Sequence, residues 1–196
     1  MANHATIDHI PNSAHGLFRP HVARASDLAR SFDPGEVLRD QAFLTAFLPY
    51  AVAQSRRHVE PVSILCVAAD RLAAIEDLLG PGLAETALRR VSETVARALR
   101  TSDVVARFDD NRLVAVLPHA GAADVPMIAE AVRKAVFEIG KPTTSMPRLT
   151  VTIGTATYPD NANNADNLLT AAVEALERAR GLGANRIVTS KRTPFE

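Results

Sequence analysis

The apolar residues of the chain form two kinds of pattern, continuous runs and helical stripes, which predict alternating strands and helices. Pro61–Ala68 is an almost uninterrupted apolar run, as expected of a central strand that is covered on both faces. Val104–Phe108 and Leu113–Leu117 are short apolar runs rich in valine and leucine, and the polar segment between them predicts a β-hairpin. Leu149–Tyr158 and Arg186–Thr189 are predicted as two further strands.

Helical spacing of apolar residues predicts the helices between these strands. Residues 36–58 carry one apolar stripe, and Pro49 is expected to kink or split this helix because proline cannot donate a backbone hydrogen bond. Further helices are predicted at Asp70–Leu79, Leu83–Leu99, Asp124–Ile139 and Ala165–Arg180, and a loop at Lys141–Met146. The order β-α-α-β-β-α-β predicts one α/β sandwich.

Length and composition favour a single domain. A chain of 196 residues with 47% hydrophobic residues can bury one substantial core but is short for two domains. We expect a flexible N-terminal segment at 1–32 and a domain at 33–196, with a leading helix at about 36–58 and a core at 59–190. The histidines of the N-terminal segment lack nearby cysteines or paired carboxylates, so no metal site is expected at His4, His9, His15 or His21.

Charge and cysteine content exclude several classes of protein. The chain has 22 Lys+Arg and 22 Asp+Glu residues, so no overall field draws it to nucleic acid or to an anionic membrane. Its single cysteine, Cys66, lies in the apolar run of the central strand, which argues against a disulfide framework. No apolar run is long enough to span a bilayer, and the N-terminal segment lacks the apolar region of a signal peptide. We therefore expect a cytoplasmic protein, or the cytoplasmic part of one.

Arg100–Pro118 reads RTSDVVARFDDNRLVAVLP and resembles the hairpin of GGDEF domains, which make cyclic di-GMP from two GTP molecules. The family consensus is RxxD, five residues, GG(D/E)EF, and a strand that ends in Leu-Pro or Met-Pro. The chain keeps this frame without a gap, but DDNRL at 109–113 replaces the signature. Three further segments resemble motifs of the family, in the order that the family shows: residues 62–88, 149–159 and 168–187. The resemblance implies a GGDEF-like, nucleotidyl-cyclase-like α/β sandwich, with a central and mainly antiparallel sheet flanked by helices.

The resemblance also implies that the catalytic residues of the family are missing. Its two metal-binding carboxylates correspond to Ala68 and Asn111, and the paired glycines of its signature correspond to Asp109 and Asp110. Phosphoryl transfer needs a divalent cation held by carboxylates, and two aspartates oppose a polyphosphate. We therefore expect a degenerate domain with no cyclase activity, no cofactor and no metal ion. Other substrate-contacting positions of the family correspond to Ala73, Glu76, Glu85, Arg180 and Ala184, and its leading turn keeps only Asp33 and Phe43.

The remaining aspartates are not expected to rebuild a cation site. Asp70 aligns with a family aspartate that is not a metal ligand. Asp109, Asp110 and Asn111 have a simpler role, because Asp and Asn tolerate left-handed turn conformations and bond their own backbone. We interpret these hairpin residues as turn residues.

Arg100 and Asp103 are the candidate ligand-binding residues. In the family this RxxD pair is the inhibitory site that holds cyclic di-GMP away from the active site, so the resemblance implies the same ligand here. A guanidinium offers a planar fork to phosphate or guanine, and a carboxylate accepts from guanine nitrogens. The family often adds an arginine from the following helix; that position is Ala131, and Arg133 or Lys134 could take its place. Alternatively, Arg100 and Asp103 only pair with each other on the surface, or Asp103 only satisfies backbone donors before the strand.

Two hypotheses about function remain open. In the first, a catalytically inactive domain is a cyclic di-GMP receptor in bacterial second-messenger signalling. The ligand binds at Arg100 and Asp103, could bridge two copies into a homodimer, and changes what the protein contacts. In the second, the domain is a protein interaction or dimerisation scaffold that needs no nucleotide. A pocket that holds GTP without turnover is disfavoured by Asp109 and Asp110, and the identity of a protein partner is not predicted.

Overall fold

The computed structural model describes residues 38–141 and 148–191. The predicted N-terminal segment, the first residues of the predicted leading helix and all of the predicted loop except Lys141 lie outside these ranges. The elements are α2 (Gln41–His58), β1 (Val62–Ala69), α3 (Leu72–Leu79), α4 (Pro81–Ala98), β2 (Val104–Arg107), β3 (Arg112–Pro118), α5 (Val125–Ile139), β4 (Val151–Tyr158), α6 (Ala165–Gly181) and β5 (Ile187–Thr189). The predicted order of strands and helices is therefore correct.

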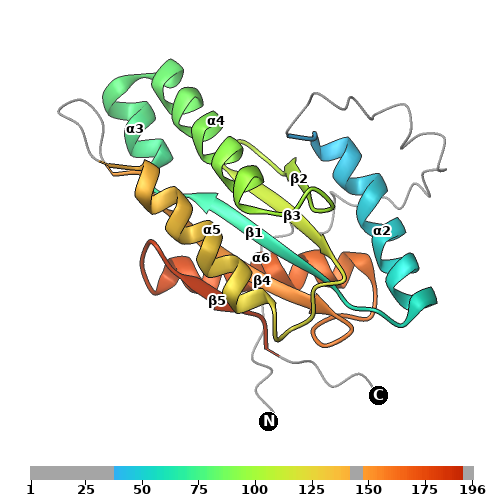
Figure 1. Cartoon of the computed structure of the whole chain (residues 1–196). Helices are drawn as coiled ribbons and strands as arrows, with labels where there is room; N and C mark the ends of the chain where they lie inside the picture. Colours follow the sequence, from blue (N-terminus) through green and yellow to red (C-terminus); the bar gives the residue numbers. More distant parts are fainter. Residues whose placement is uncertain (1–37, 142–147, 192–196) are drawn as a thin grey trace, which may run out of the picture.

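A five-stranded sheet with strand order β2-β3-β1-β4-β5 lies at the centre of the fold (Figure 1). β1 pairs antiparallel with both β3 and β4, and β2 pairs antiparallel with β3, whereas β4 and β5 are parallel. Every residue of β1 is buried, as its continuous apolar run predicts. The predicted α/β sandwich with a mainly antiparallel central sheet is confirmed.

Helices cover both faces of this sheet (Figure 1). α3, α4 and α5 pack on the face that includes Leu65 and Val67, and α2 and α6 pack on the face that includes Ile64 and Cys66. The β1 residues that face these two groups of helices alternate along the strand, because successive side chains of a strand point to opposite faces. Among the described residues, no helix combines the length and the apolarity that crossing a membrane requires.

The leading helix differs from its prediction in two respects. It begins at Gln41, where the side chain of Asp40 accepts a hydrogen bond of 2.7 Å from the backbone N–H of Phe43. Arg39, which precedes Asp40, pairs with β2, donating its N–H to Val105 O at 2.9 Å and accepting from Arg107 N at 2.7 Å. Pro49 lies inside α2 without splitting it. Burial of apolar side chains on both sides of the proline keeps the helix continuous despite the missing hydrogen bond.

α6 approaches β4 closely because Gly154 has no side chain. A Cβ at Gly154 would lie 2.2 Å from both Ala172 O and Leu176 N of α6. The backbone of α6 therefore rests directly on β4. This contact fixes Glu177, the next residue of α6, in its position relative to the β2–β3 hairpin.

Candidate functional site

The turn of the β2–β3 hairpin lies beside the end of β1. Arg112 is the pairing partner of Ala68, and Ala69 donates its N–H to Asn111 O at 3.2 Å. Within the turn, Oδ1 of Asp109 accepts hydrogen bonds from the backbone N–H groups of Asn111 at 3.2 Å and Arg112 at 2.9 Å. Asp109 therefore bonds its own turn, as expected of aspartate at such a position.

Arg112 gives this turn an internal ion pair. Its Nε donates to Asp109 Oδ2 at 2.6 Å, and its Nη2 also contacts that oxygen. Nη1 lies 3.9 Å from Glu177 Oε1, and the guanidinium stands 4.9 Å from the centre of the Phe108 ring. Arg112 occupies the fourth position of the signature, where the family consensus has a glutamate. A carboxylate is thus replaced by a cation that binds neighbouring carboxylates of the same chain.

A second ion pair joins the hairpin to α4. Nη1 and Nη2 of Arg107 lie 3.3 Å and 3.4 Å from the two carboxylate oxygens of Glu85, and Nε donates to Asp109 O at 3.3 Å. Glu85 stands where the family has a guanine-reading aspartate. Its carboxylate therefore already contacts an arginine within the chain.

Asp70, which follows β1, accepts three hydrogen bonds. Its Oδ2 accepts from the hydroxyl of Thr150 at 2.7 Å and from the N–H of Asn185 at 2.9 Å, and its Oδ1 accepts from the hydroxyl of Thr152 at 2.7 Å. These donors come from β4, from the residue before it and from the segment that precedes β5. Asp70 therefore joins three neighbouring parts of the sheet.

The hairpin end of the sheet offers no set of metal ligands in the part of the chain that the structure describes. No group of three His, Cys, Asp or Glu side chains there could hold a metal ion. Ala68 is fully buried and carries no ligand atom, and Asn111 is half-buried. Cys66, also in β1, is buried, and this burial raises the pKa of its thiol to about 12. A thiol with that pKa is a poor nucleophile and a poor metal ligand at neutral pH.

Arg100 and Asp103 lie together in the turn between α4 and β2. Oδ2 of Asp103 accepts a hydrogen bond of 2.8 Å from the backbone N–H of Arg100, and Asp103 N donates to Arg100 O at 3.0 Å. Partial burial raises the pKa of Asp103. Arg100 is exposed, and its guanidinium has no hydrogen-bond or ion-pair partner among the described residues. The structure thus shows the alternative in which Asp103 satisfies a backbone donor, and the Arg100 guanidinium forms no ion pair with Asp103.

The fold does not bring Arg133 to Arg100 and Asp103. Its Nε and Nη2 each donate to Glu130 at 2.8 Å, and its Nη1 donates to Asn185 Oδ1 at 2.8 Å, on the β5 side of the sheet. The RxxD turn leads into β2, at the opposite edge. The hydrogen bond from Arg133 also lowers the pKa of Glu130 to about 2.

Helix geometry explains why Arg133 is misplaced. It follows Ala131 by two residues, a rotation of about 200° around an α-helix, and so projects from nearly the opposite side of α5. Lys134 is three residues beyond Ala131 and shares its side of the helix. Its side chain is 69% exposed, with Nζ 3.6 Å from Glu130 Oε1. Of the two basic residues considered from the sequence, Lys134 is therefore the better placed.

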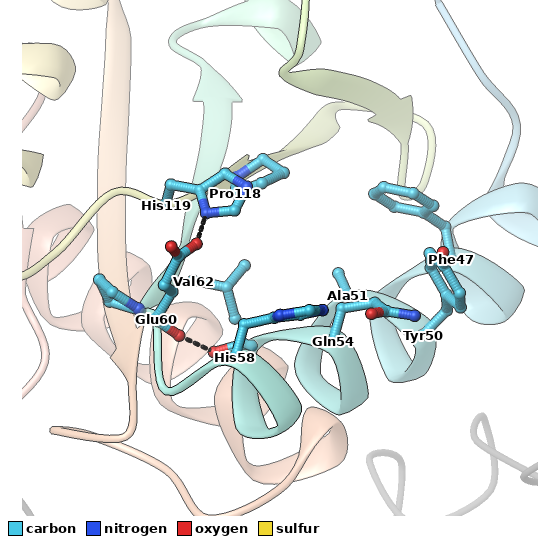
Figure 2. A pocket seen from close by; sticks show the side chains of 11 residues that line it. Phe47, Tyr50, Ala51, Gln54, His58, Glu60, Val62, Pro118 and His119 are labelled. Carbon is cyan, nitrogen blue, oxygen red and sulfur yellow. Dashed lines mark hydrogen bonds and ion pairs between the residues drawn. The ribbon is translucent and has the colours of Figure 1, made fainter.

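A pocket lies at the other end of β1, where the sequence indicates no site. Figure 2 shows Phe47, Tyr50 and His58 of α2 on one side of it, and Glu60, Pro118 and His119 on the other. These residues come from segments that are about 60 positions apart in sequence, so no motif joins them. The helical spacing of the α2 residues is the one sequence signal for this pocket, and it is equally typical of a buried stripe.

Comparison with known proteins agrees with the fold. The family described as diguanylate cyclase, GGDEF domain, matches residues 31–186. Diguanylate cyclase DgcM of Escherichia coli strain K12 is 30% identical over 128 residues, which cover 65% of this chain and 30% of that protein. The chain spans about a third of the length of the curated relatives it matches.

Solved structures show the same architecture. The GGDEF domain of TpbB (YfiN) from Pseudomonas aeruginosa has a TM-score of 0.74 and 27% identity, over 80% of this chain and 98% of that one. The GGDEF domain of DgcB from Caulobacter crescentus, in complex with c-di-GMP, has a TM-score of 0.72 over 82% of this chain and 93% of that one; at 18% identity it shows likeness of fold alone. From the family match and the shared fold, the chain belongs to the GGDEF family.

Proposed function

We propose that this GGDEF domain binds cyclic di-GMP at Arg100 and Asp103 and does not synthesise it. The proposal for binding rests on one observation, the exposed Arg100 guanidinium beside a carboxylate that its own backbone holds in place. That carboxylate retains acceptor capacity, because an ionised Asp offers about four lone-pair sites and the Arg100 N–H uses one. The pair thus offers a planar donor to phosphate or guanine and an acceptor to guanine nitrogens.

The absence of catalysis is proposed from the hairpin turn. Both oxygens of Asp109 accept hydrogen bonds within the turn, and Arg112 places a cation where the consensus signature has a carboxylate. Asp70 accepts hydrogen bonds from three donors of the chain itself. Transfer between two GTP molecules requires divalent cations that neutralise the phosphates. The carboxylates of Asp109 and Asp70 are thus engaged in contacts within the chain.

The binding site is tested by calorimetric titration of the full chain with cyclic di-GMP, with GTP as the control ligand. We expect micromolar or tighter binding, and Arg100→Ala should weaken it by roughly ten-fold to more than a hundred-fold, since a charge-assisted contact contributes about 1.5–3 kcal/mol. Arg97→Ala is the matched control, because Arg97 lies one turn earlier on α4 and pairs with Glu93 at 2.9 Å. Equal losses for the two variants would mean that general charge, not the RxxD turn, holds the ligand.

Catalysis is tested separately, by incubating the chain with GTP and Mg²⁺ or Mn²⁺ and separating the nucleotides by chromatography. We expect no cyclic di-GMP above the level of a protein-free control. Product formation would overturn this half of the proposal and leave the binding site untouched.

A nucleotide-independent scaffold is the second candidate, and the position of Arg133 favours it. With Arg133 held by Glu130 and Asn185, a cyclic dinucleotide at the RxxD turn meets one arginine instead of the two often present in the family. If the titration shows neither heat nor a thermal shift at millimolar ligand, the scaffold is the function that remains. A homodimer belongs to either candidate, and sedimentation with and without cyclic di-GMP distinguishes a ligand-bridged dimer from a constitutive one.

A further inference from the structure

The pocket beside α2 combines aromatic rings with a carboxylate. Figure 2 shows Phe47 and Tyr50 on one side of the pocket, and Glu60 and His119 on the other. The volume of the pocket is about 190 Å³. Engineered cavities of about 150 Å³ accept benzene, whereas sites for drug-sized ligands usually occupy about 300–1,000 Å³. The pocket therefore has room for one small aromatic ring system, and the rest of a larger ligand would stay outside.

Phe47 and Tyr50 provide a surface on which a planar ligand can stack. Their ring centroids are 6.3 Å apart, and Tyr50 is 45% exposed. Val62 and Pro118 add apolar surface to the lining between this wall and the far side. Aromatic rings gain from offset or edge-to-face contacts with one another, and nucleobases of every kind stack on aromatic side chains. The lining therefore favours a flat aromatic ligand.

Glu60 gives the pocket a preference for a ligand that donates hydrogen bonds. Among the described residues that line the pocket, Glu60 carries the one carboxylate, and none is a lysine or an arginine. Nδ1 of His119 contacts this carboxylate, but an ionised carboxylate offers about four lone-pair sites, so two further donors can bind it. Gln54 also lines the pocket, and its amide has no hydrogen-bond partner in the described part of the chain. A ligand with adjacent N–H donors would therefore find acceptors here.

The charges near the pocket disfavour a cationic ligand. Arg56 and Arg57 lie in the last turn of α2, and both are exposed. Neither has an ion-pair partner among the residues that the structure describes. Like charges repel at short range, so an ammonium or guanidinium group that approached Glu60 would meet two uncompensated arginines. A neutral ring that carries N–H donors binds the carboxylate without this repulsion.

Val59 and His119 adopt uncommon backbone conformations beside the pocket. Their φ angles are 57° and 59°, in the left-handed region that is costly for residues other than glycine, and most of all for a β-branched residue such as valine. Val59 directly precedes Glu60, and it is 92% exposed. Strained conformations of this kind cluster at sites that hold ligands. Here they accompany the contact between Glu60 and His119.

We propose that this pocket binds a purine base whose edge carries a ring N–H next to an exocyclic amino group, as the edge of guanine does. The base stacks on Phe47 and Tyr50, and the carboxylate of Glu60 accepts from both donors, a bidentate arrangement. The amide of Gln54 donates to the neighbouring carbonyl oxygen of the base. The sugar and phosphate of the nucleotide stay outside the pocket.

This proposal does not rest on cyclic di-GMP binding at Arg100. The two sites nevertheless lie at the same end of the sheet, because Val104, which follows the Arg100–Asp103 turn, pairs with Val116, and Val62 pairs with Pro118. The experiment must therefore distinguish a base in the pocket from a nucleotide at the turn.

The probe is guanosine monophosphate, titrated to about 10 mM into the ¹⁵N-labelled full chain, since a small ligand with few contacts binds weakly. Inosine monophosphate lacks the exocyclic amino group, and adenosine monophosphate has an acceptor in place of the ring N–H; all three carry the same phosphate. We expect saturable amide shifts at Tyr50, Gln54 and His119. The guanine nucleotide should bind about two-fold to ten-fold more tightly than the inosine nucleotide, the range for one lost hydrogen bond, and the adenine nucleotide should bind most weakly.

Two pairs of variants test the named contacts. Glu60→Gln should remove most of the preference for guanine over the inosine base, whereas Glu138→Gln should keep it, because Glu138 is an exposed glutamate of α5, on the other face of the sheet from α2. Tyr50→Ala should weaken binding by about five-fold or more, and Tyr50→Phe, which keeps the ring, should bind like the native chain. Glu60 and Tyr50 are exposed, so these variants should fold, and their amide spectra check this directly.

Arg100→Ala separates the pocket from the RxxD turn. The shifts at Tyr50, Gln54 and His119 should persist in this variant with unchanged affinity. The proposal is overturned if these shifts are absent from the native chain, or if they disappear with Arg100, since the nucleotide would then be held at the turn. It is also overturned if the guanine and adenine nucleotides bind alike, or if Glu60→Gln and Glu138→Gln behave alike, since neither result leaves a role for the carboxylate in reading the base.

Discussion

Asp70 provides the sharpest test of the proposal that carboxylates near the hairpin serve structural contacts. Its carboxylate accepts three hydrogen bonds, from Thr150, Thr152 and Asn185 N, at 2.7–2.9 Å. Hydrogen bonds to a charged group contribute about 1.5–3 kcal/mol each, but Asp70 is half-buried, so the released donors can turn partly to water. We therefore expect Asp70→Ala to lower the free energy of unfolding by about 2–4 kcal/mol.

The measurement is urea unfolding of the full chain, followed by circular dichroism, with and without Mg²⁺. Asp110→Ala is the matched control, because Asp110 is exposed and should change the free energy of unfolding by less than about 0.5 kcal/mol. A loss below about 1 kcal/mol for Asp70→Ala would refute the structural role of this carboxylate. A loss seen only in the presence of Mg²⁺ would also refute it, since that result would identify Asp70 as a metal ligand.

Three further predictions concern packing and titration. Gly154→Ala should destabilise the chain by at least about 3 kcal/mol or prevent its folding, measured by thermal unfolding, because its Cβ would lie 2.2 Å from the backbone of α6. The pKa of Glu130 is lowered to about 2 from an ordinary 4.5. The contribution of Glu130 to stability is therefore complete above the ordinary pKa and is lost as pH falls toward 2. The difference in melting temperature between the native chain and Glu130→Gln should shrink as the pH falls over that interval. Cys66, whose pKa burial raises to about 12, should resist a disulfide reagent at pH ~8 in the folded chain and react in urea.

The sequence was sufficient for the strands and the hairpin because each is a short apolar run with polar residues at its ends. The start of α2 could not be predicted, since the pairing of Arg39 with Val105 and Arg107 depends on segments more than 60 residues apart. Pro49 was expected to kink or split α2, and the helix is not split, because burial on both sides of the proline outweighs one lost hydrogen bond. Packing between distant segments, which a local pattern does not encode, decided both outcomes.

The candidate sites also divide into residues whose proximity the local sequence predicts and residues that only the folded chain brings together. Arg100 and Asp103 are three residues apart in one turn, so their proximity follows from local geometry. Sequence spacing alone could not show whether Arg133 reaches Arg100 and Asp103, because the direction of its side chain depends on the rotation of α5 and on Asn185, which lies 52 residues away. The pocket beside α2 combines a helix with a loop after β3, and only the folded chain brings these together.

The contacts around the hairpin turn support the proposal that this domain keeps the GGDEF fold without the cyclase chemistry. A cyclase needs carboxylates that stay unpaired until a cation binds, and unpaired like charges close together destabilise the protein that carries them. Here Asp109 is paired with Arg112, Glu85 with Arg107, and Asp70 with hydroxyl and amide donors. Each of these three carboxylates has a partner in the chain itself. We therefore propose that the turn that in the family binds substrate serves here to join the hairpin to α4 and α6, while the Arg100 guanidinium lies outside this network of ion pairs.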